Sequence, residues 1–178
     1  ICGGYQMLGE RISDPLHTES EHDAVEGLGY LPLTTTFAAR KHLRQVTADC
    51  AAFPFLGENI SVHGMRGYEI HMGDTRFAEE VCRPFHIVRA GNAEESVLDG
   101  AASADGGVVG TYIHGIFDDD HFRRAVLNRL RVRRGMEELP IQYRCGAEKE
   151  HAYDRLAATV QRSLDMDKLA AIIAAGES

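Results

Sequence analysis

The chain has 178 residues, of which 44% are hydrophobic and 26% are charged, which is ordinary usage for a globular protein of one domain. Its uncharged apolar runs fall well short of the ~20 residues that a membrane-spanning helix needs. The formal net charge of −8 comes from acidic residues scattered along the chain, and this argues against a nucleic-acid-binding surface. We therefore expect one domain over residues 1–178, with no membrane and no nucleic acid among its partners.

The cysteines and histidines give no sign of a metal site or of disulfides. Cys2, Cys50, Cys82 and Cys145 form no Cys-x-x-Cys pair, and no two of the nine histidines stand at His-x-x-x-His spacing. The sequence carries no signal peptide that would indicate an oxidising compartment. It therefore predicts no metal, free thiols and a cytoplasmic location.

The first nine residues place a cysteine at a predicted sharp turn. Cys2 stands between Ile1 and the pair Gly3-Gly4, directly before helical spacing begins. This pattern is typical of a nucleophile elbow, in which a side chain sits on a strand-to-helix turn and glycines tolerate strained backbone angles. The positive end of the helix dipole favours a thiolate, which is the nucleophilic form. The alternative is a buried cysteine that packs as a small hydrophobic residue.

The segments that follow predict a short helix, a loop and two strands. The helix covers residues 5–11 and ends at Ser13-Asp14-Pro15, and residues 16–28 form an acidic loop. Residues 29–37 are β-branched and apolar, which predicts a strand, and Pro32 places it at a sheet edge. Alternating side chains predict a weaker strand over residues 42–48.

A clearer strand is predicted over residues 67–72. Its even-numbered side chains, from Tyr68 to Met72, share one face, and Glu69 and His71 share the other. We expect one of these faces to belong to the core and one to be polar. Glu69 and His71 either face solvent or border a binding site.

The second half of the chain predicts a central strand followed by helices. Residues 89–106 read as a loop with one short strand over 96–98, and residues 107–113 as a central strand with His114 at its carboxyl end. Aspartates 118–120 offer N-caps for a helix over residues 121–134. Residues 145–178 predict a closing helical tail, whose last short helix is capped by Asp167.

Cys2 and His114 are the candidate catalytic pair. In open α/β sheets, reactive groups gather at the carboxyl ends of strands, where both residues are predicted to lie. A thiolate with a histidine base can attack an amide, release ammonia and hydrolyse the resulting thioester. The backbone N–H of Gly3 is placed to hold the developing oxyanion. The alternative for His114 is a hydrogen-bonded core histidine at a strand end.

Three sequence blocks, in this order, resemble a known enzyme family. They are Ile-Cys-Gly-Gly-Tyr-Gln-Met-Leu-Gly over 1–9, Gly-Tyr-Glu-Ile-His-Met-Gly over 67–73 and Gly-Thr-Tyr-Ile-His-Gly-Ile-Phe-Asp over 110–118. They are similar to the signature blocks of class I (triad-type) glutamine amidotransferases, within the branch formed by cobyric acid synthases and their relatives in cobalamin biosynthesis. Tyr-Asp-Arg-Leu-Ala over 153–157 and Leu164-Asp165 are similar to the closing helix of that branch.

The resemblance implies a fold and a division of labour. The expected fold is α/β, with an open, mostly parallel sheet flanked by helices, flavodoxin-like and truncated at its N-terminus, since a strand must precede an elbow. In the family, ATP and Mg²⁺ chemistry belongs to a separate N-terminal domain. We expect no cofactor within these residues, which contain no Gly-x-x-x-x-Gly-Lys-Ser/Thr loop.

The resemblance also implies a substrate and its contacts. Glutamine is the expected substrate, with Gln6 contacting its amino-acid head and Gly3, Tyr68, Glu69 and His71 at its pocket. A corrinoid, adenosylcobyrinic a,c-diamide, would bind through the missing domain and be amidated there with ammonia from glutamine. A homo-oligomer stays open. The wider class carries a glutamate two residues after its histidine, and here that position is Ile116, so the acid that orients His114 is unassigned; Asp118, Glu69 and a carboxylate of the missing domain are candidates.

Two other functions stay open from the sequence. One is a related amidotransferase, either a cobyrinate a,c-diamide synthase or the subunit that serves lipid II amidation. The other is a catalytically silent domain that keeps the fold as a scaffold. The joint presence of Cys2, Gly3, Gly4, Gln6 and His114 argues against the silent domain.

Overall fold

A computed structural model describes residues 1–89 and 96–176, which form two compact units, Ile1–Ile141 and Gln142–Ser178. The first unit holds the sheet and two α-helices, α1 (Gly3–Met7) and α2 (Asp120–Arg133), with a 3-10 turn, η1 (Ile116–Asp118). The second holds α3 (Cys145–Ser163) and α4 (Met166–Ala175). Residues 90–95 of the loop predicted over 89–106 lie outside the described residues.

The main sheet of the first unit is built on two long strands, β3 and β4. Its neighbours follow the order β2-β1-β3-β4-β9, while β5 pairs with β3 and β6 with β5. A separate small sheet pairs β7 with β8. The strands are β1 (Arg11–Ser13), β2 (Ala24–Glu26), β3 (Leu33–Phe55), β4 (Glu58–Phe77), β5 (Phe85–Arg89), β6 (Ser96–Asp99), β7 (Ala101–Ala102), β8 (Val109–Gly110) and β9 (Ile113–His114).

The architecture is α/β, with an open, mixed sheet flanked by helices, which confirms the predicted fold class. Among the described strands, β1 and β3 pair in parallel and the other pairings are antiparallel, so parallel pairing is less extensive than the sequence led us to expect. The reason is that residues 33–77 fold as one hairpin, and a tight hairpin connection can join antiparallel strands only.

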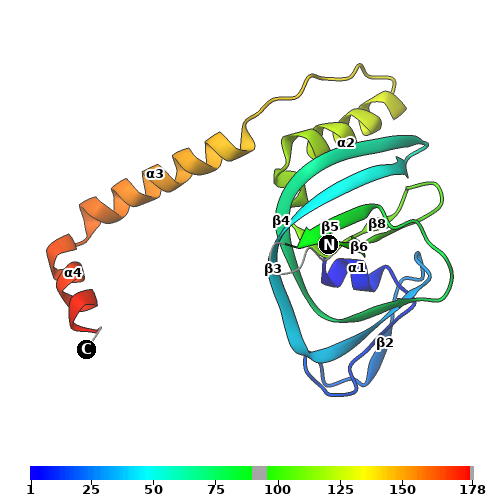
Figure 1. The fold of residues 1–178 in the computed structure, drawn as a ribbon, viewed down its shortest axis with the longest axis horizontal. Helices are drawn as coiled ribbons and strands as arrows, with labels where there is room; N and C mark the ends of the chain where they lie inside the picture. Colours follow the sequence, from blue (N-terminus) through cyan, green and yellow to red (C-terminus); the bar gives the residue numbers. More distant parts are fainter. Residues whose placement is uncertain (90–95, 177–178) are drawn as a thin grey trace. The chain divides into compact units, whose positions relative to one another are not determined.

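That hairpin joins β3 to β4 through Leu56 and Gly57, both of which have positive φ. Figure 1 shows the two strands running side by side as one bent ribbon. Register shifts interrupt the pairing between Thr36 and Lys41 and again between Ala48 and Phe53, and such bulges bend a strand. The strand predicted over 29–37, from Leu33 on, and the strand predicted over 42–48 are therefore parts of β3. Pro32 precedes β3, which is internal to the sheet, so the predicted sheet edge at Pro32 is wrong.

The chain after Cys2 differs from the sequence prediction. The helix predicted over residues 5–11 is the shorter α1, and Arg11–Ser13 is strand β1. The chain leaves the helix here for two reasons. Gly9 packs directly on Leu33, so that a Cβ at Gly9 would lie 2.4 Å from the Leu33 side chain. In addition, the Glu10 N–H donates to the Leu33 carbonyl at 2.8 Å. The loop predicted over 16–28 contains the short strand β2.

The predicted central strand over 107–113 is broken in two. Val109–Gly110 is β8 in the small sheet, and Ile113–His114 is β9 at the edge of the main sheet, where it pairs with β4. Thr111 and Tyr112 lie between the two strands and are buried. The prediction failed because an apolar β-branched run predicts extended backbone but not the sheet to which each residue belongs.

Two buried clusters hold the first unit together. The larger lies between the β3–β5 region and α2, whose Phe122 is 3% exposed. The smaller surrounds Tyr5 of α1 and includes Leu31, Leu33 and Tyr112. The predicted α2 is confirmed, and its N-cap is Asp119, which accepts from the Phe122 N–H at 2.8 Å. Burial of α1 in this way fixes the turn that carries Cys2.

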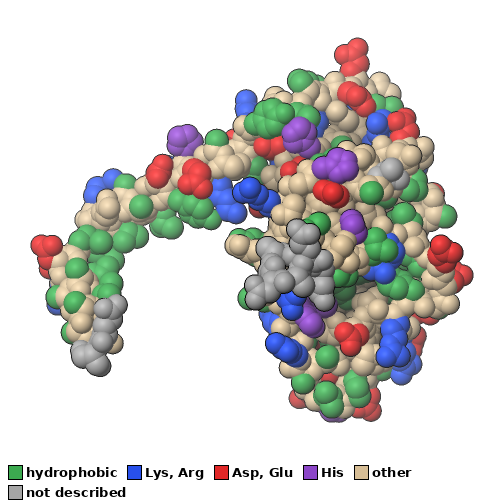
Figure 2. Space-filling view, in the orientation of Figure 1, with side chains coloured by type: hydrophobic (Ala, Val, Ile, Leu, Met, Phe, Trp, Pro, Cys, Tyr) green, Lys and Arg blue, Asp and Glu red, His purple; other side chains and the backbone are tan. Residues whose placement is uncertain are grey.

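In the second unit, no residue of α3 or α4 is buried. Figure 2 shows hydrophobic side chains along one side of this unit. The exposed apolar residues of its helices include Tyr153, Leu156, Val160, Met166, Ile172 and Ile173. Asp165, rather than the predicted Asp167, caps α4, since its carboxylate accepts from the Lys168 N–H at 3.0 Å. Among the described residues, no helix is both long enough and apolar enough to cross a membrane.

Candidate active site

Cys2 lies on a strained turn at the start of α1. It is the N-cap residue, with φ 54° and ψ −120°. Residues other than glycine rarely adopt this backbone conformation. Its N–H donates to the Thr111 carbonyl at 3.0 Å, which holds the turn in place. The strain therefore falls on Cys2 itself and not, as predicted, on the glycines beside it. Strain of this kind clusters at active sites, where the surrounding structure maintains it.

His114 ends the edge strand β9, opposite Tyr68 of β4. The strands approach closely because residue 67 is glycine: a Cβ there would lie 2.6 Å from the His114 carbonyl oxygen. Residues directly opposite each other in a sheet share a face, so His114 and Tyr68 lie on the same side of β4. Gly67, the first residue of the second sequence block, thus permits His114 of the third block to reach its position.

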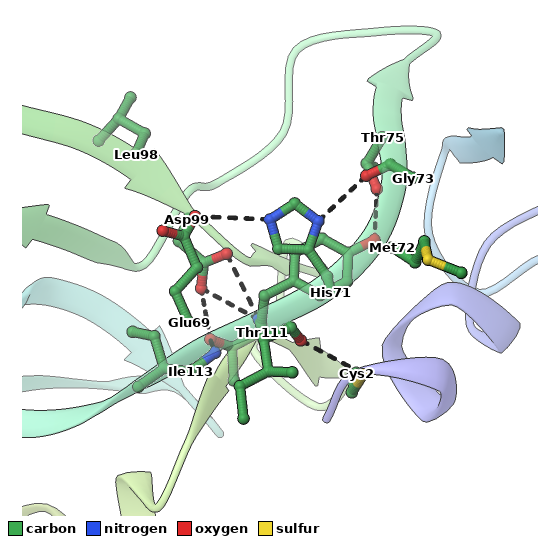
Figure 3. A network of polar contacts seen from close by, with 12 residues as sticks. Cys2, Glu69, His71, Met72, Gly73, Thr75, Leu98, Asp99, Thr111 and Ile113 are labelled. Atoms are coloured by element: carbon green, nitrogen blue, oxygen red, sulfur yellow. Dashed lines mark hydrogen bonds and ion pairs between the residues drawn. The ribbon is translucent and has the colours of Figure 1, made fainter. Parts of the chain in front are cut away.

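One backbone oxygen brings Cys2 and His114 together. The Cys2 sulfur lies 3.4 Å from the Ile70 carbonyl oxygen, and His114 Nε2 lies 3.2 Å from the same atom. Figure 3 shows the bond from Cys2 to this strand. Because a carbonyl oxygen only accepts, the thiol and the Nε2–H group both donate to it. Within residues 1–89 and 96–176, no hydrogen bond joins the sulfur directly to the ring. The two predicted catalytic residues nevertheless share a neighbour.

The first helical turn offers a free donor next to Cys2, the Gly3 N–H. The Gly4 N–H donates to the Ile1 carbonyl at 3.1 Å, whereas the described part of the chain gives the Gly3 N–H no acceptor. The first N–H groups of a helix have no partner within it, so this donor is available to an anion. A Cβ at Gly3 or Gly4 would meet no atom within 4 Å, which leaves space above the turn.

The His114 ring bonds the Ile70 carbonyl, and of the two acids that the sequence offered as its partners, one lies beside His71 and the other at the surface. Glu69, one candidate from the sequence, lies 3.5 Å from the His71 ring, and Asp118, the other, is exposed. Ile116, at the position where the wider class carries glutamate, is 1% exposed and belongs to the apolar core. Ile116 therefore supplies no carboxylate to a triad, and the acid that would orient His114 stays unassigned.

Gln6 is buried behind the turn. It is 4% exposed, and its Nε2 donates to the Met72 carbonyl at 3.2 Å and to the Tyr112 hydroxyl at 3.4 Å. These bonds tie α1 to β4 and to the segment before β9. Its predicted contact with the head of glutamine stays a prediction, and the carbonyl end of the side chain is the part left for it.

The other predicted pocket residues fall on two faces of β4. Tyr68 is 45% exposed on the face of His114, whereas Glu69 is 4% exposed on the opposite face, with His71. The predicted strand is thus confirmed, but its buried face is the polar one rather than the face of Tyr68. The structure places Tyr68 beside His114 and leaves Glu69 and His71 in a packed layer behind the strand.

His71 is held on all sides in that layer. Its ring stacks between His42, at 4.9 Å, and Tyr112, at 4.3 Å. Nδ1 lies 3.0 Å from the Gly73 carbonyl and Nε2 lies 3.5 Å from the Glu69 carboxylate, as Figure 3 shows. Burial lowers the pKa of His71, but the bonds to Glu69 and Gly73 and the charges of Glu69 and Asp99 outweigh it and raise the pKa. His71 is therefore poised to carry a proton on both ring nitrogens.

Comparison with known proteins decides the family of this site. Residues 1–122 match the model of the CobB/CobQ-like glutamine amidotransferase domain, which is more than half of the chain. The chain belongs to this family. Curated relatives include the cobyric acid synthases of Dehalococcoides mccartyi, 41% identical over 99% of this chain, Moorella thermoacetica, 42% identical over 97%, and Caldanaerobacter subterraneus, 44% identical over 95%.

The match to these relatives extends past the family model, because it covers the second unit as well as the first. The chain spans about a third of the length of each relative, 34%, 33% and 34% in turn. The predicted resemblance to the amidotransferase part of cobyric acid synthases is thereby confirmed. Cys2 and His114 both lie within the residues that match the CobB/CobQ-like amidotransferase model.

The Glu69–His71 pair predicts a pH dependence of stability. A histidine whose pKa is raised by folding stabilises the fold below its unfolded pKa of about 6.5, and this contribution is lost as the pH rises through the higher folded value. We expect the free energy of unfolding, measured by urea titration, to fall over that range. Glu69→Gln should flatten the profile. His63→Gln is the control, since the side chain of His63 is 73% exposed, and an unchanged profile in Glu69→Gln would contradict the prediction.

Sequence reasoning missed Asp99, Thr111 and Tyr112 as parts of this amidotransferase site. Asp99 precedes Gly100, which has positive φ, and Asp-Gly reads as an exposed turn. In the structure Asp99 is 5% exposed and accepts bonds from Thr111 and Tyr112. The one signal in the sequence is that Thr111 and Tyr112 stand within the third block, three and two residues before His114.

Proposed function

We propose that this chain is the glutaminase part of a cobyric acid synthase: it hydrolyses glutamine with Cys2 and His114 and supplies the ammonia. The observation that carries the proposal is the shared oxygen, since the Cys2 sulfur and His114 Nε2 both lie within hydrogen-bonding distance of the Ile70 carbonyl. Membership of the glutamine amidotransferase family and the identity to cobyric acid synthases over nearly the whole chain support it.

The first half-reaction forms a thioester. The Cys2 thiol gives its proton to His114, and the thiolate attacks the side-chain amide carbon of glutamine. The resulting oxyanion accepts from the Gly3 N–H, a donor that is most effective when it is fixed before the reaction begins. The His114 imidazolium then protonates the amide nitrogen, the carbon–nitrogen bond breaks and ammonia leaves.

The second half-reaction releases glutamate. His114, now neutral, takes a proton from water as the hydroxide adds to the thioester carbon. The carbon–sulfur bond breaks and Cys2 returns to the thiol. The Ile70 carbonyl holds both donors in the absence of substrate, so glutamine must draw the sulfur and the ring away from it. Catalytic hydrogen bonds often tighten in this way only when substrate is bound.

The use of ammonia is assigned to a part of the protein outside these residues. We propose that ATP and Mg²⁺ activate a carboxylate of adenosylcobyrinic a,c-diamide there, and that ammonia converts it to an amide. The chain contains no Gly-x-x-x-x-Gly-Lys-Ser/Thr loop that would bind nucleotide phosphates in a P-loop manner. We also propose that the protein is located in the cytoplasm and forms a homo-oligomer.

Selective alkylation tests the proposed nucleophile. An electrophilic glutamine analogue, such as a diazoketone, should label Cys2 in the intact protein and leave Cys50, Cys82 and Cys145 unlabelled, as measured by peptide mass spectrometry. Cys50 is fully buried, and burial raises the pKa of its thiol to about 12. Iodoacetamide in the unfolded protein, which should label all four, is the control. Equal labelling of all four by the glutamine analogue in the folded protein would refute the assignment.

A further inference from the structure

The segment Thr111–Tyr112, between β8 and β9, connects the two halves of the site. The Thr111 carbonyl accepts from the Cys2 N–H at 3.0 Å, and the Tyr112 carbonyl accepts from the Ile70 N–H at 3.3 Å. His114 follows two residues later. A shift of this segment would therefore move the nucleophile, the shared carbonyl and the base relative to one another.

The segment belongs to no strand, so side-chain bonds add to these two backbone bonds in fixing its position. The Thr111 hydroxyl donates to the Asp99 carboxylate and accepts from the Ile113 N–H at 3.0 Å. The Tyr112 N–H donates to the same carboxylate, at 3.2 Å to Oδ2 and 3.4 Å to Oδ1. Figure 3 shows Asp99 beside Thr111, behind the strand that Cys2 contacts.

Asp99 lies at the end of β6, in the interior of the first unit. It is 5% exposed, and burial raises the pKa of its carboxyl group against the bonds from Thr111, Tyr112 and Gly100, which lower the pKa. A buried carboxylate is costly unless it is hydrogen-bonded, and these are the bonds that offset the cost. The bonds are thus strongly favoured, and they fix residues 111 and 112.

We propose that Asp99 is a positioning residue of the glutaminase site: through Thr111 and Tyr112 it holds Cys2 and His114 on the Ile70 carbonyl. This rests on the proposed function, because the two residues that it positions are the proposed nucleophile and base. Asp99 itself does not contact either of them. It acts on them indirectly, by holding the backbone of residues 111 and 112.

The first test replaces the acceptor. Asparagine at position 99 has one acceptor oxygen, while its amide nitrogen donates and would face the Thr111 hydroxyl or the Tyr112 N–H. In the intact protein, Asp99→Asn should lower kcat for glutamine on the order of 10- to 100-fold, because a misplacement of about 1 Å can cost 100-fold. The KM for glutamine should stay near the wild-type value. An unchanged kcat would overturn the proposal.

A matched control separates position from stability. Asp14 is also buried, at 2% exposed, and accepts bonds from Thr18, Glu19 and Ser20, all in its own loop. Asp14→Asn should destabilise that loop and leave kcat unchanged. If Asp14→Asn and Asp99→Asn lower kcat equally at equal loss of stability, Asp99 is structural and the proposal fails.

Substitutions at Thr111 keep the proposal testable if Asp99→Asn does not fold. Thr111→Val removes the hydroxyl and should lower kcat as Asp99→Asn does. Thr111→Ser retains the hydroxyl and should keep most of the wild-type kcat. The double variant with Asp99→Asn should be no worse than Asp99→Asn alone, since coupled residues are not additive. Equal activity of the valine and serine variants would overturn the proposal.

Amide exchange gives a readout that does not depend on glutamine hydrolysis. The Tyr112 and Ile113 amides should exchange faster with deuterium in Asp99→Asn and in Thr111→Val, and not in Asp14→Asn. Wild-type protein that fails to hydrolyse glutamine would refute the proposed function alone. Faster exchange of these amides in Asp99→Asn with an unaltered kcat would refute the positioning role alone. Exchange as slow in Asp99→Asn as in the wild-type protein would refute the anchoring of residues 111 and 112 by Asp99.

Discussion

Replacement of Cys2 by serine should abolish glutamine-dependent amidation in the intact protein and leave ammonia-dependent amidation in place. A serine hydroxyl without an adapted base is a far weaker nucleophile than a thiolate, so thioester formation stops. Under the proposed function free ammonia bypasses that step, because activation of the acceptor carboxylate is assigned to residues outside this chain. The expected loss with glutamine is several orders of magnitude, in line with removal of a nucleophile.

The measurement compares product formation with glutamine against product formation with ammonium salts, at raised pH, where more of the ammonium is NH₃. Cys145→Ser is the matched control, since Cys145 lies in the second unit and outside the family model. If folded Cys2→Ser protein loses both activities, Cys2 serves the use of ammonia rather than its production, and the proposed function has to be withdrawn.

The positions of Cys2 and His114, the proposed catalytic pair, could be predicted because their signals are local. A cysteine beside two glycines at the start of a helix predicts a turn whatever lies around it, and the structure adds that Cys2 itself adopts the strained angle. His114 stands at the end of an apolar run, and strand ends are visible in sequence. The helix α2 is likewise local, because Asp119 caps it directly.

The supporting layer could not be predicted, because burial of a polar residue depends on contacts distant in sequence. Glu69 and His71 lie on the opposite face of β4 from Tyr68 whichever way the strand is turned. The periodicity of the sequence does not say which of the two faces packs inward. Here it is the acid and the histidine that face inward, since the ring of Tyr112 and that of His42 stack on His71.

The pairing of strands was hidden for the same reason. The two short strands predicted before residue 50 are one strand, and the residues between them are bulged. A register shift does not interrupt extended backbone, but it breaks the alternation on which strand prediction rests. Conversely, the run over 107–113 looks continuous and divides between two sheets, and this division creates the segment that Asp99 anchors.

Replacement of His114 by alanine should also remove glutamine-dependent amidation and spare the reaction with ammonia. General acid–base catalysis by a positioned side chain contributes about 10²- to 10⁴-fold, and under the proposed function His114 acts in both half-reactions. The folded protein should otherwise be little changed, because the ring makes one hydrogen bond to the described residues, to the Ile70 carbonyl. His63→Ala is the control, since His63 lies on the same strand as Ile70 and is well exposed.

The double variant gives the sharper result. If Cys2 and His114 form a single reacting unit as proposed, Cys2→Ser with His114→Ala should be no less active with glutamine than Cys2→Ser alone. Additive losses would mean that His114 contributes to a step in which Cys2 takes no part. The shared carbonyl would then hold two unrelated groups, and the base for the thiol would have to be sought among residues that make no contact with the Cys2 sulfur in this structure.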